Sequence, residues 1–127
     1  MATSPVPGPP LGAFGEAVDQ STGAAAVAQN DSLFVKGWAA DWHDGAPVSA
    51  VTVYIDGVAA GAATLGIQRP DVAATYSNPA FLNSGWTFSV SASGLTVGTH
   101  TVSAVATNSL SLSTTLGYRY ITVVPGD

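Results

Sequence analysis

The chain has 127 residues, no cysteine and a formal net charge of −5. It has only three lysine and arginine residues, too few for the basic surface that nucleic acid or an anionic membrane requires, so we expect neither as a partner. Without cysteine there are no disulfides and no thiolate chemistry, and the length predicts a single domain.

Charged residues make up 9% of the chain. Ser, Thr, Gly and Ala take the place of the missing charges, a composition typical of extracellular β-modules. The sequence has no run of 18 apolar residues, so we expect no membrane insertion.

The first residues, MATSPVPGPPLG, contain four prolines within ten positions. Proline keeps a chain extended, so we interpret residues 1–12 as a linker or tail. The predicted organisation continues with one domain over residues 13–124 and a short tail over residues 125–127.

Alternation of apolar and polar residues with a period of two dominates the rest of the chain. Each such run predicts a strand with one face in a core and the other toward water. In chain order, the predicted strands cover residues 13–19, 24–29, 32–41, 50–56, 58–65, 86–90, 100–107 and 114–123. Seven to eight strands separated by turn signals predict an all-β antiparallel sandwich.

Two connections carry signals of their own. Asp56 and Gly57 lie between two predicted strands and form the strongest short hairpin signal. Residues 66–84 break the alternation, and within them Pro70 suits the first position of a helix, with Asp71 near its positive end. We therefore predict one short helical turn over residues 70–76, inside a long crossover loop.

The alternation does not decide which aromatic residues face inward. Phe34 and Trp38 share one face of their strand, and Val35 lies on the other, so both faces are partly apolar. Trp38 is therefore either a core residue or part of an exposed aromatic patch. Tyr118 and Tyr120 raise the same alternative, and a contiguous exposed patch would mark a partner surface.

Five blocks in order carry a family resemblance: FVKGWAAD, VSAVTVYIDG, RPDVAATY, GWTFSV and LTVGTHTVSAVATNS. Over about residues 13–124 the chain resembles a bacterial immunoglobulin-like domain of secreted or cell-surface proteins. The resemblance implies an immunoglobulin-like sandwich, an extracellular or cell-surface location, and a place beside adhesive or catalytic domains. It implies no particular ligand, because a fold does not fix a function.

Antibody-type domains join their sheets by a disulfide and place a tyrosine two residues before the second cysteine. In this chain Val102 stands at the cysteine position and His100 at the tyrosine position. We therefore expect His100 to have a structural role, with a hydrogen bond to backbone at that bend. Asn108 lies where the family commonly carries an Asp-rich turn.

The loop DWHDGAP, residues 41–47, is the main candidate for recognition, because it joins two strands at one end of the sandwich. Trp42 has an apolar ring on which a sugar could stack, and Asp41, His43 and Asp44 could bind the sugar hydroxyls. In the alternative interpretation Asp41 caps the turn through backbone bonds and Trp42 folds over the sandwich end. The sequence leaves both interpretations open.

Other polar residues near loops favour structural roles. Asp56 and Gly57 are assigned to their hairpin turn. Arg69 and Asp71 flank Pro70, and they either reach a ligand or hold the crossover against the sandwich. We favour the second interpretation, because the planar guanidinium of arginine suits contacts with an acid or with carbonyl groups.

Metal and catalytic sites find little support. The acids near loops lack the Asp-x-Asp-x-Asp spacing of an EF-hand, and two histidines without cysteine do not make a zinc site. We expect no metal and no cofactor, with calcium kept as an alternative. We also expect no enzyme, because the chain lacks a serine elbow, an opposed pair of carboxylates and a glycine-rich phosphate loop.

These features predict a non-catalytic extracellular module that acts in structure, spacing, adhesion or self-association within a larger protein. Its partner would be a protein or a glycan at the cell surface. Two alternatives stay open: a carbohydrate-binding module that uses the Trp42 loop, and a calcium-dependent interaction module.

Overall fold

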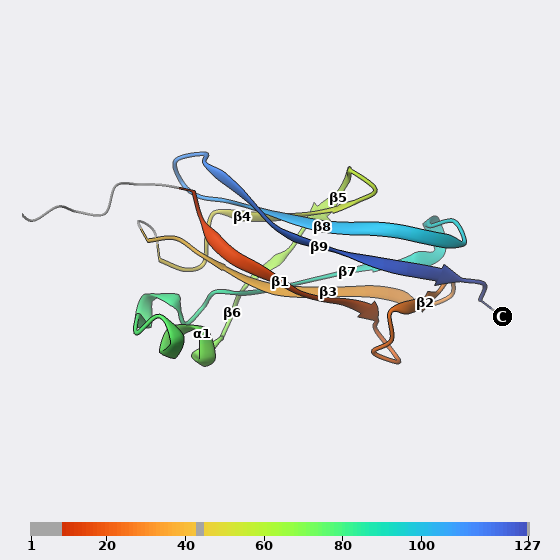
Figure 1. Ribbon diagram of the computed structural model, residues 1–127, viewed down its shortest axis with the longest axis horizontal. Helices are drawn as coiled ribbons and strands as arrows, with labels where there is room; N and C mark the ends of the chain where they lie inside the picture. The colour runs from red at the N-terminus through yellow and green to blue at the C-terminus, as the bar shows by residue number, and fades with distance from the viewer. Residues whose placement is uncertain (1–8, 43–44, 127) are drawn as a thin grey trace, which may run out of the picture.

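The computed structural model describes residues 9–42 and 45–126, which form two β-sheets packed face to face (Figure 1). The strands are β1 (Leu11–Asp19), β2 (Ala26–Ala28), β3 (Ser32–Ala40), β4 (Ala50–Ile55), β5 (Val58–Ala62), β6 (Thr64–Ile67), β7 (Gly85–Ser91), β8 (Gly98–Thr107) and β9 (Ser113–Val124). The helical elements are α1 (Pro70–Thr75), η1 (Pro79–Phe81) and η2 (Ala92–Gly94). The predicted all-β immunoglobulin-like sandwich is confirmed.

One sheet has four strands in the order β1-β3-β7-β6, and the other has five in the order β2-β9-β8-β4-β5. All strand pairs are antiparallel except β2 with β9. The described residues contain nine strands, one more than the predicted maximum. The run predicted over residues 58–65 forms two strands, because β5 pairs with β4 in one sheet and β6 pairs with β7 in the other.

The chain also changes sheets between β1 and β2. Asp19, 2% exposed, stabilises the turn at this point. Its Oδ1 accepts hydrogen bonds from the backbone N–H groups of Ser21 and Thr22, and its Oδ2 accepts one from Ala28 in β2. One carboxylate thereby joins the end of a strand in one sheet to a strand of the other, which closes one edge of the sandwich.

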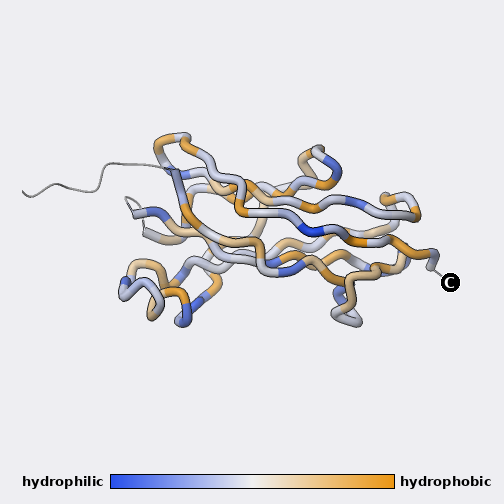
Figure 2. The backbone as a smooth tube through the Cα atoms, in the orientation of Figure 1, coloured by the Kyte–Doolittle hydropathy of each residue, from blue (hydrophilic) through white to orange (hydrophobic). Residues whose placement is uncertain are grey.

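The core follows the predicted alternation on β4 and β8. Val51 and Val53 on β4, and Val102 and Ala104 on β8, are buried, and the residues between them face outward. Orange and pale segments alternate in the same way along the strands in Figure 2. Trp86 of β7 fills the other side of the core.

Strand β3 buries the face that carries Val35 and Gly37, and Trp38 lies on its outer face. Gly37 is paired with Trp86 across the β3–β7 ladder. A Cβ atom at Gly37 would lie 2.6 Å from Cζ2 of the buried Trp86 ring. The absence of a side chain at Gly37 therefore leaves the space that the indole occupies.

The crossover between β6 and β7 packs on the outer side of β3. The predicted helical turn is present as α1, which begins at Pro70. Val72 and Phe81 are buried there with Ala40, and Trp38 packs against them as part of a second, small hydrophobic cluster. Within the described residues, no helix has the length and apolar character needed to cross a bilayer.

Candidate functional site

The loop between β3 and β4, with the predicted recognition residues, lies at one end of the sandwich (Figure 1). Asp41 and Gly45 form an isolated antiparallel bridge, in which the N–H of each donates to the carbonyl of the other, at 2.8 and 2.6 Å. This bridge closes the base of the loop. His43 and Asp44, two of the predicted ligand-binding residues, lie outside the described residues.

The Asp41 side chain is turned into the protein and is 1% exposed. Its Oδ2 accepts a 2.8 Å hydrogen bond from Nδ2 of Asn108, in the loop between β8 and β9. Oδ1 of Asn108 accepts hydrogen bonds from the backbone N–H groups of Leu110 and Leu112, both at 3.0 Å. This contact joins two loops. It leaves the Asp41 carboxylate with little surface for a sugar hydroxyl, which one of the two interpretations of this loop required.

Trp42 has the opposite environment, with 54% of the residue exposed. Its ring leans on the buried Phe81, with centroids 4.9 Å apart, and meets Tyr76 edge to face at 5.9 Å and 74°. Trp38 contacts Tyr76 at 5.5 Å, so these four residues form one aromatic cluster. Because the rings of Trp42 and Tyr76 are nearly perpendicular, the two exposed residues do not form one flat surface.

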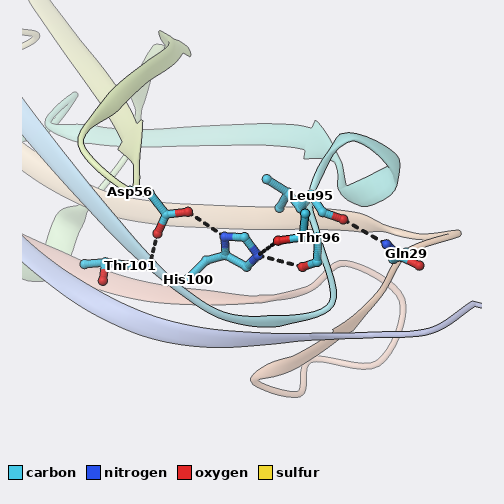
Figure 3. A network of polar contacts seen from close by, with 6 residues as sticks. All are labelled: Gln29, Asp56, Leu95, Thr96, His100 and Thr101. Atoms are coloured by element: carbon cyan, nitrogen blue, oxygen red, sulfur yellow. Dashed lines mark hydrogen bonds and ion pairs between the residues drawn. The ribbon is translucent and has the colours of Figure 1, made fainter.

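The opposite end of the sandwich is held by His100, which lies near the start of β8 (Figure 3). Its Nε2 lies 2.7 Å from the carbonyl oxygen of Thr96, and its Nδ1 lies 2.6 Å from Oδ2 of Asp56. The Thr96 contact is a backbone hydrogen bond at the bend where the sequence places one. A carbonyl and a carboxylate both accept hydrogen bonds, so this arrangement favours the protonated imidazole, in which both ring nitrogens donate.

Asp56 is shared between its own turn and β8. Asp56 and Gly57 have φ angles of 53° and 82° and form a two-residue hairpin connection between β4 and β5. The carboxylate also accepts a 2.9 Å hydrogen bond from the N–H of Thr101. The alternation on β4 and the Asp-Gly signal predicted the turn. They did not predict that the Asp56 carboxylate would bind β8.

These hydrogen bonds shift the pKa values of His100 and Asp56. The backbone hydrogen bond to Thr96, and then the contact with Asp56, raise the pKa of His100 against the opposing effect of burial. The hydrogen bond from the Thr101 backbone, and then the contact with His100, lower the pKa of the Asp56 carboxyl. Each group thus favours the charged form of the other.

Arg69 and Asp71 pair with each other across Pro70. Nε and Nη2 of Arg69 donate to the two carboxylate oxygens of Asp71, at 2.9 and 2.8 Å. The pair holds the pKa of the Asp71 carboxyl at about 2, chiefly through these hydrogen bonds. The backbone N–H of Arg69 donates to the carbonyl of Leu82, and its Cγ lies close to Gly85 of β7. The start of the crossover is thereby placed against its end and against β7.

A hollow of about 440 Å³ lies along β1, β3 and β7, and no pattern in the sequence predicted it. Lys36 and Arg69 line it, so it carries two of the three cations of the chain. Each has an acid partner: Lys36 Nζ lies 3.3 Å from Glu16, and Arg69 binds Asp71. Because each cation is paired with one acid, the two ion pairs add no net charge to the hollow.

Tyr118 and Tyr120 are exposed on β9, with their ring centroids 5.5 Å apart. Arg119, between them, turns away toward β1. Its guanidinium lies 5.7 Å from the ring centroid of Phe14 and donates to the Phe14 carbonyl at 3.1 Å, where the β1–β3 register shifts next to Gly15. Sequence reasoning missed this contact, which ties β9 to β1.

The described part of the chain brings together no group of three His, Asp or Glu side chains suited to a metal ion.

No protein-family model and no curated protein matches this chain. Among solved structures, the fibronectin(III)-like modules of Clostridium thermocellum CbhA are similar to it, with a TM-score of 0.59 and 17% sequence identity. The match covers 92% of this chain and 47% of that structure, so the chain spans about half of the structure's length. At this identity the likeness shows the fold alone.

The His100 contacts predict a pH-dependent stability. Because the folded pKa of His100 is raised above its ordinary value near 6.5, its contribution is complete at lower pH and is lost as the pH rises through the folded value. Urea unfolding of the wild type and of His100→Gln should differ by about 1 kcal/mol or more at pH 6, and the difference should shrink toward pH 9. The Asp56 contribution is lost only as the pH falls below about 3.8.

The second histidine of the sequence, His43, is present in both proteins and is therefore common to both sides of the comparison. A difference that stays constant from pH 5 to pH 9 would contradict a protonated His100.

Proposed function

We propose that this chain is a non-catalytic immunoglobulin-like module of a larger secreted or cell-surface protein. It would space neighbouring domains and provide contacts for a protein or glycan partner. The proposal rests on one observation: the polar side chains at the two ends of β8 bind each other within the fold. Asp56 and His100 hold one end, and Asp41 and Asn108 hold the other.

A catalytic site needs polar groups that converge on one position where a reacting atom could sit. His100 and Asn108 are eight residues apart along the same strand and its turn, which is roughly 26 Å at 3.3 Å per residue. Asp41 is buried, and both oxygens of Asp56 are engaged within the fold. These groups support the fold and do not converge on a shared pocket.

The structural likeness supports a modular context, since that solved protein consists of fibronectin(III)-like modules and is about twice as long as the matched region. An extracellular location fits the low charge and the family resemblance. The modular context and the extracellular location are parts of the proposal.

The module role predicts that the isolated chain turns over no substrate in a panel of chromogenic glycosides, esters and peptides. It also predicts the same melting temperature in EDTA as in calcium, because a metal that binds the native state would raise it. Turnover by the wild type that disappears in a folded Asp56→Asn variant would contradict the proposal. A lower melting temperature in EDTA would support the calcium-dependent alternative.

A carbohydrate-binding role is the second candidate, and the exposed Trp42 favours it. An exposed indole suits stacking on the C–H face of one sugar ring. The perpendicular rings do not make a flat platform for several sugar units, and the buried Asp41 gives little polar support. We therefore place this role second.

In affinity electrophoresis through soluble neutral polysaccharides, this second role predicts retardation of the wild type. Trp42→Ala should weaken the retardation about tenfold, because the stacking surface is lost. Tyr120→Ala is the matched control, since it removes an exposed aromatic ring from the other sheet. Circular dichroism checks that each variant folds. No retardation of the wild type, or an equal loss in Tyr120→Ala, would reject the Trp42 site.

A further inference from the structure

The outer face of the five-stranded sheet is open. Outward residues alternate with the buried ones along β4, β8 and β9. None of the described helices lies over this face, because α1 and η1 cover the other sheet (Figure 1). Its central residues are Tyr54, Thr101, Ser103, Val105, Tyr118 and Tyr120, and we call this surface the neutral face.

The neutral face is uncharged in a chain whose net charge is −5. Strands β4, β5, β8 and β9 contain no Asp, Glu or Lys. Their one arginine, Arg119, directs its guanidinium over Phe14 and toward β1. His100 is on the buried side of β8. Asp56, in the β4–β5 turn, lies at the edge of the face, where its carboxylate binds His100 and the backbone of Thr101. The other described acidic residues lie in the other sheet, in the crossover or in other turns.

The centre of this face has a distinct shape. Tyr54, Ser103 and Tyr118 are direct neighbours across three strands, in one row. At about 4.8 Å per strand, the two tyrosines stand roughly 10 Å apart with a small serine between them. Tyr118 and Tyr120 are 55% and 63% exposed. Tyr54, on the other side of Ser103, is half-buried, so the small Ser103 is flanked by two tyrosine side chains.

We propose that the neutral face docks a second copy of this chain in a two-fold-related pair, with Tyr118 of each copy over Ser103 of the other. In such a pair the same patch must complement itself, and a face without charges does so without apposing like charges. The centres of protein interfaces are rich in Tyr and poor in Lys, Glu and Asp, which is the composition found here. The proposal rests on the interaction role proposed above and names its partner.

The size of the face fits a weak, reversible pair. Four strands about 4.8 Å apart and roughly 25 Å long give a projection of about 500 Å² on each copy. Two copies would then bury about 1,000 Å² together, the lower limit for a specific interface. We expect a dissociation constant on the order of 100 µM.

A neutral polysaccharide is the other partner that an uncharged hydroxyl-bearing face could take. Sugar recognition, however, usually adds polar groups that fix the orientation of the ligand. The strands of this face carry no Asn, Gln, Asp or Glu. Besides the displaced Arg119 and the inward-facing His100, their polar side chains are serine, threonine and tyrosine hydroxyls. The observations therefore favour a second copy.

The test is sedimentation equilibrium of the full chain up to about 1 mM, on the wild type and two variants of equal net charge. Ser103→Glu places a carboxylate at the centre of the neutral face of each copy, and we expect at least a tenfold weaker dimer. Ser21→Glu adds the same charge to an exposed turn after β1 and should leave the dimer within about twofold of the wild type. Added salt should leave the wild-type dimer unchanged or strengthen the dimer, because salt screens the repulsion between two copies that are each negatively charged.

Tyr118→Ala is an independent variant that removes an exposed ring and should also weaken the dimer about tenfold. A wild type that is monomeric at every concentration overturns the proposal, as does a dimer that Ser103→Glu and Ser21→Glu weaken equally. A monomer retarded by a neutral polysaccharide, with retardation lost in Ser103→Glu, also overturns it and assigns the face to a glycan. These outcomes leave the non-catalytic role intact, since turnover in the substrate panel is what contradicts that role.

Discussion

An aspartate holds the chain near each end of β8, and the rest of the sandwich is arranged around that strand. The Asp56 carboxylate binds His100 and the backbone of Thr101 near its start. The Asp41 carboxylate binds Asn108, directly after its end. Because β8 lies between β4 and β9, these contacts connect the β4–β5 hairpin, the β3–β4 loop and the β8–β9 loop to one central strand. The chain reaches a defined fold without the disulfide that antibody-type domains place between their sheets.

This arrangement determines where function can reside. Asp41 at one end, and Asp56 and His100 at the other, are engaged in internal bonds. The crossover is held by its own ion pair and aromatic cluster. What remains for contact with other molecules is surface: the exposed indole of Trp42 at one end, and the uncharged outer face of the five-stranded sheet. Both suit docking, and this supports the interaction and spacing role that we propose.

Local patterns in the sequence predicted a large part of the fold. Alternation identified the buried faces of β4 and β8, the Asp56–Gly57 pair marked its hairpin, and Pro70 marked the start of α1. The division into β5 and β6 was missed, because alanine and glycine dominate residues 58–63 and give no clear period. The outward position of Trp38 could not be decided, since both faces of β3 carry apolar residues and its cover comes from a distant crossover.

The contacts near the candidate site were harder to predict, because they join residues far apart in the chain. Asn108 lies 67 residues from Asp41, and an asparagine in a turn looks like any other turn residue. Arg119 reaches the carbonyl of Phe14 across 105 residues, where a strand irregularity exposes it. His100 was the exception, since the resemblance to the corner tyrosine indicated a backbone contact at that bend.

The most direct test of this account is the free energy of unfolding of Asn108→Asp as a function of pH, compared with Asn83→Asp at an exposed position. The substitution removes the donor to Asp41 and puts two carboxyl groups side by side in a buried place, so we predict a loss of about 3 kcal/mol at pH 7. Burial and the neighbouring charge raise the pKa of the new carboxyl group, so the loss should shrink as the pH falls toward 4. The Asn83 variant should stay within about 0.5 kcal/mol of the wild type. If Asn108→Asp unfolds like the wild type at pH 7, Asp41 and Asn108 do not hold this end of β8.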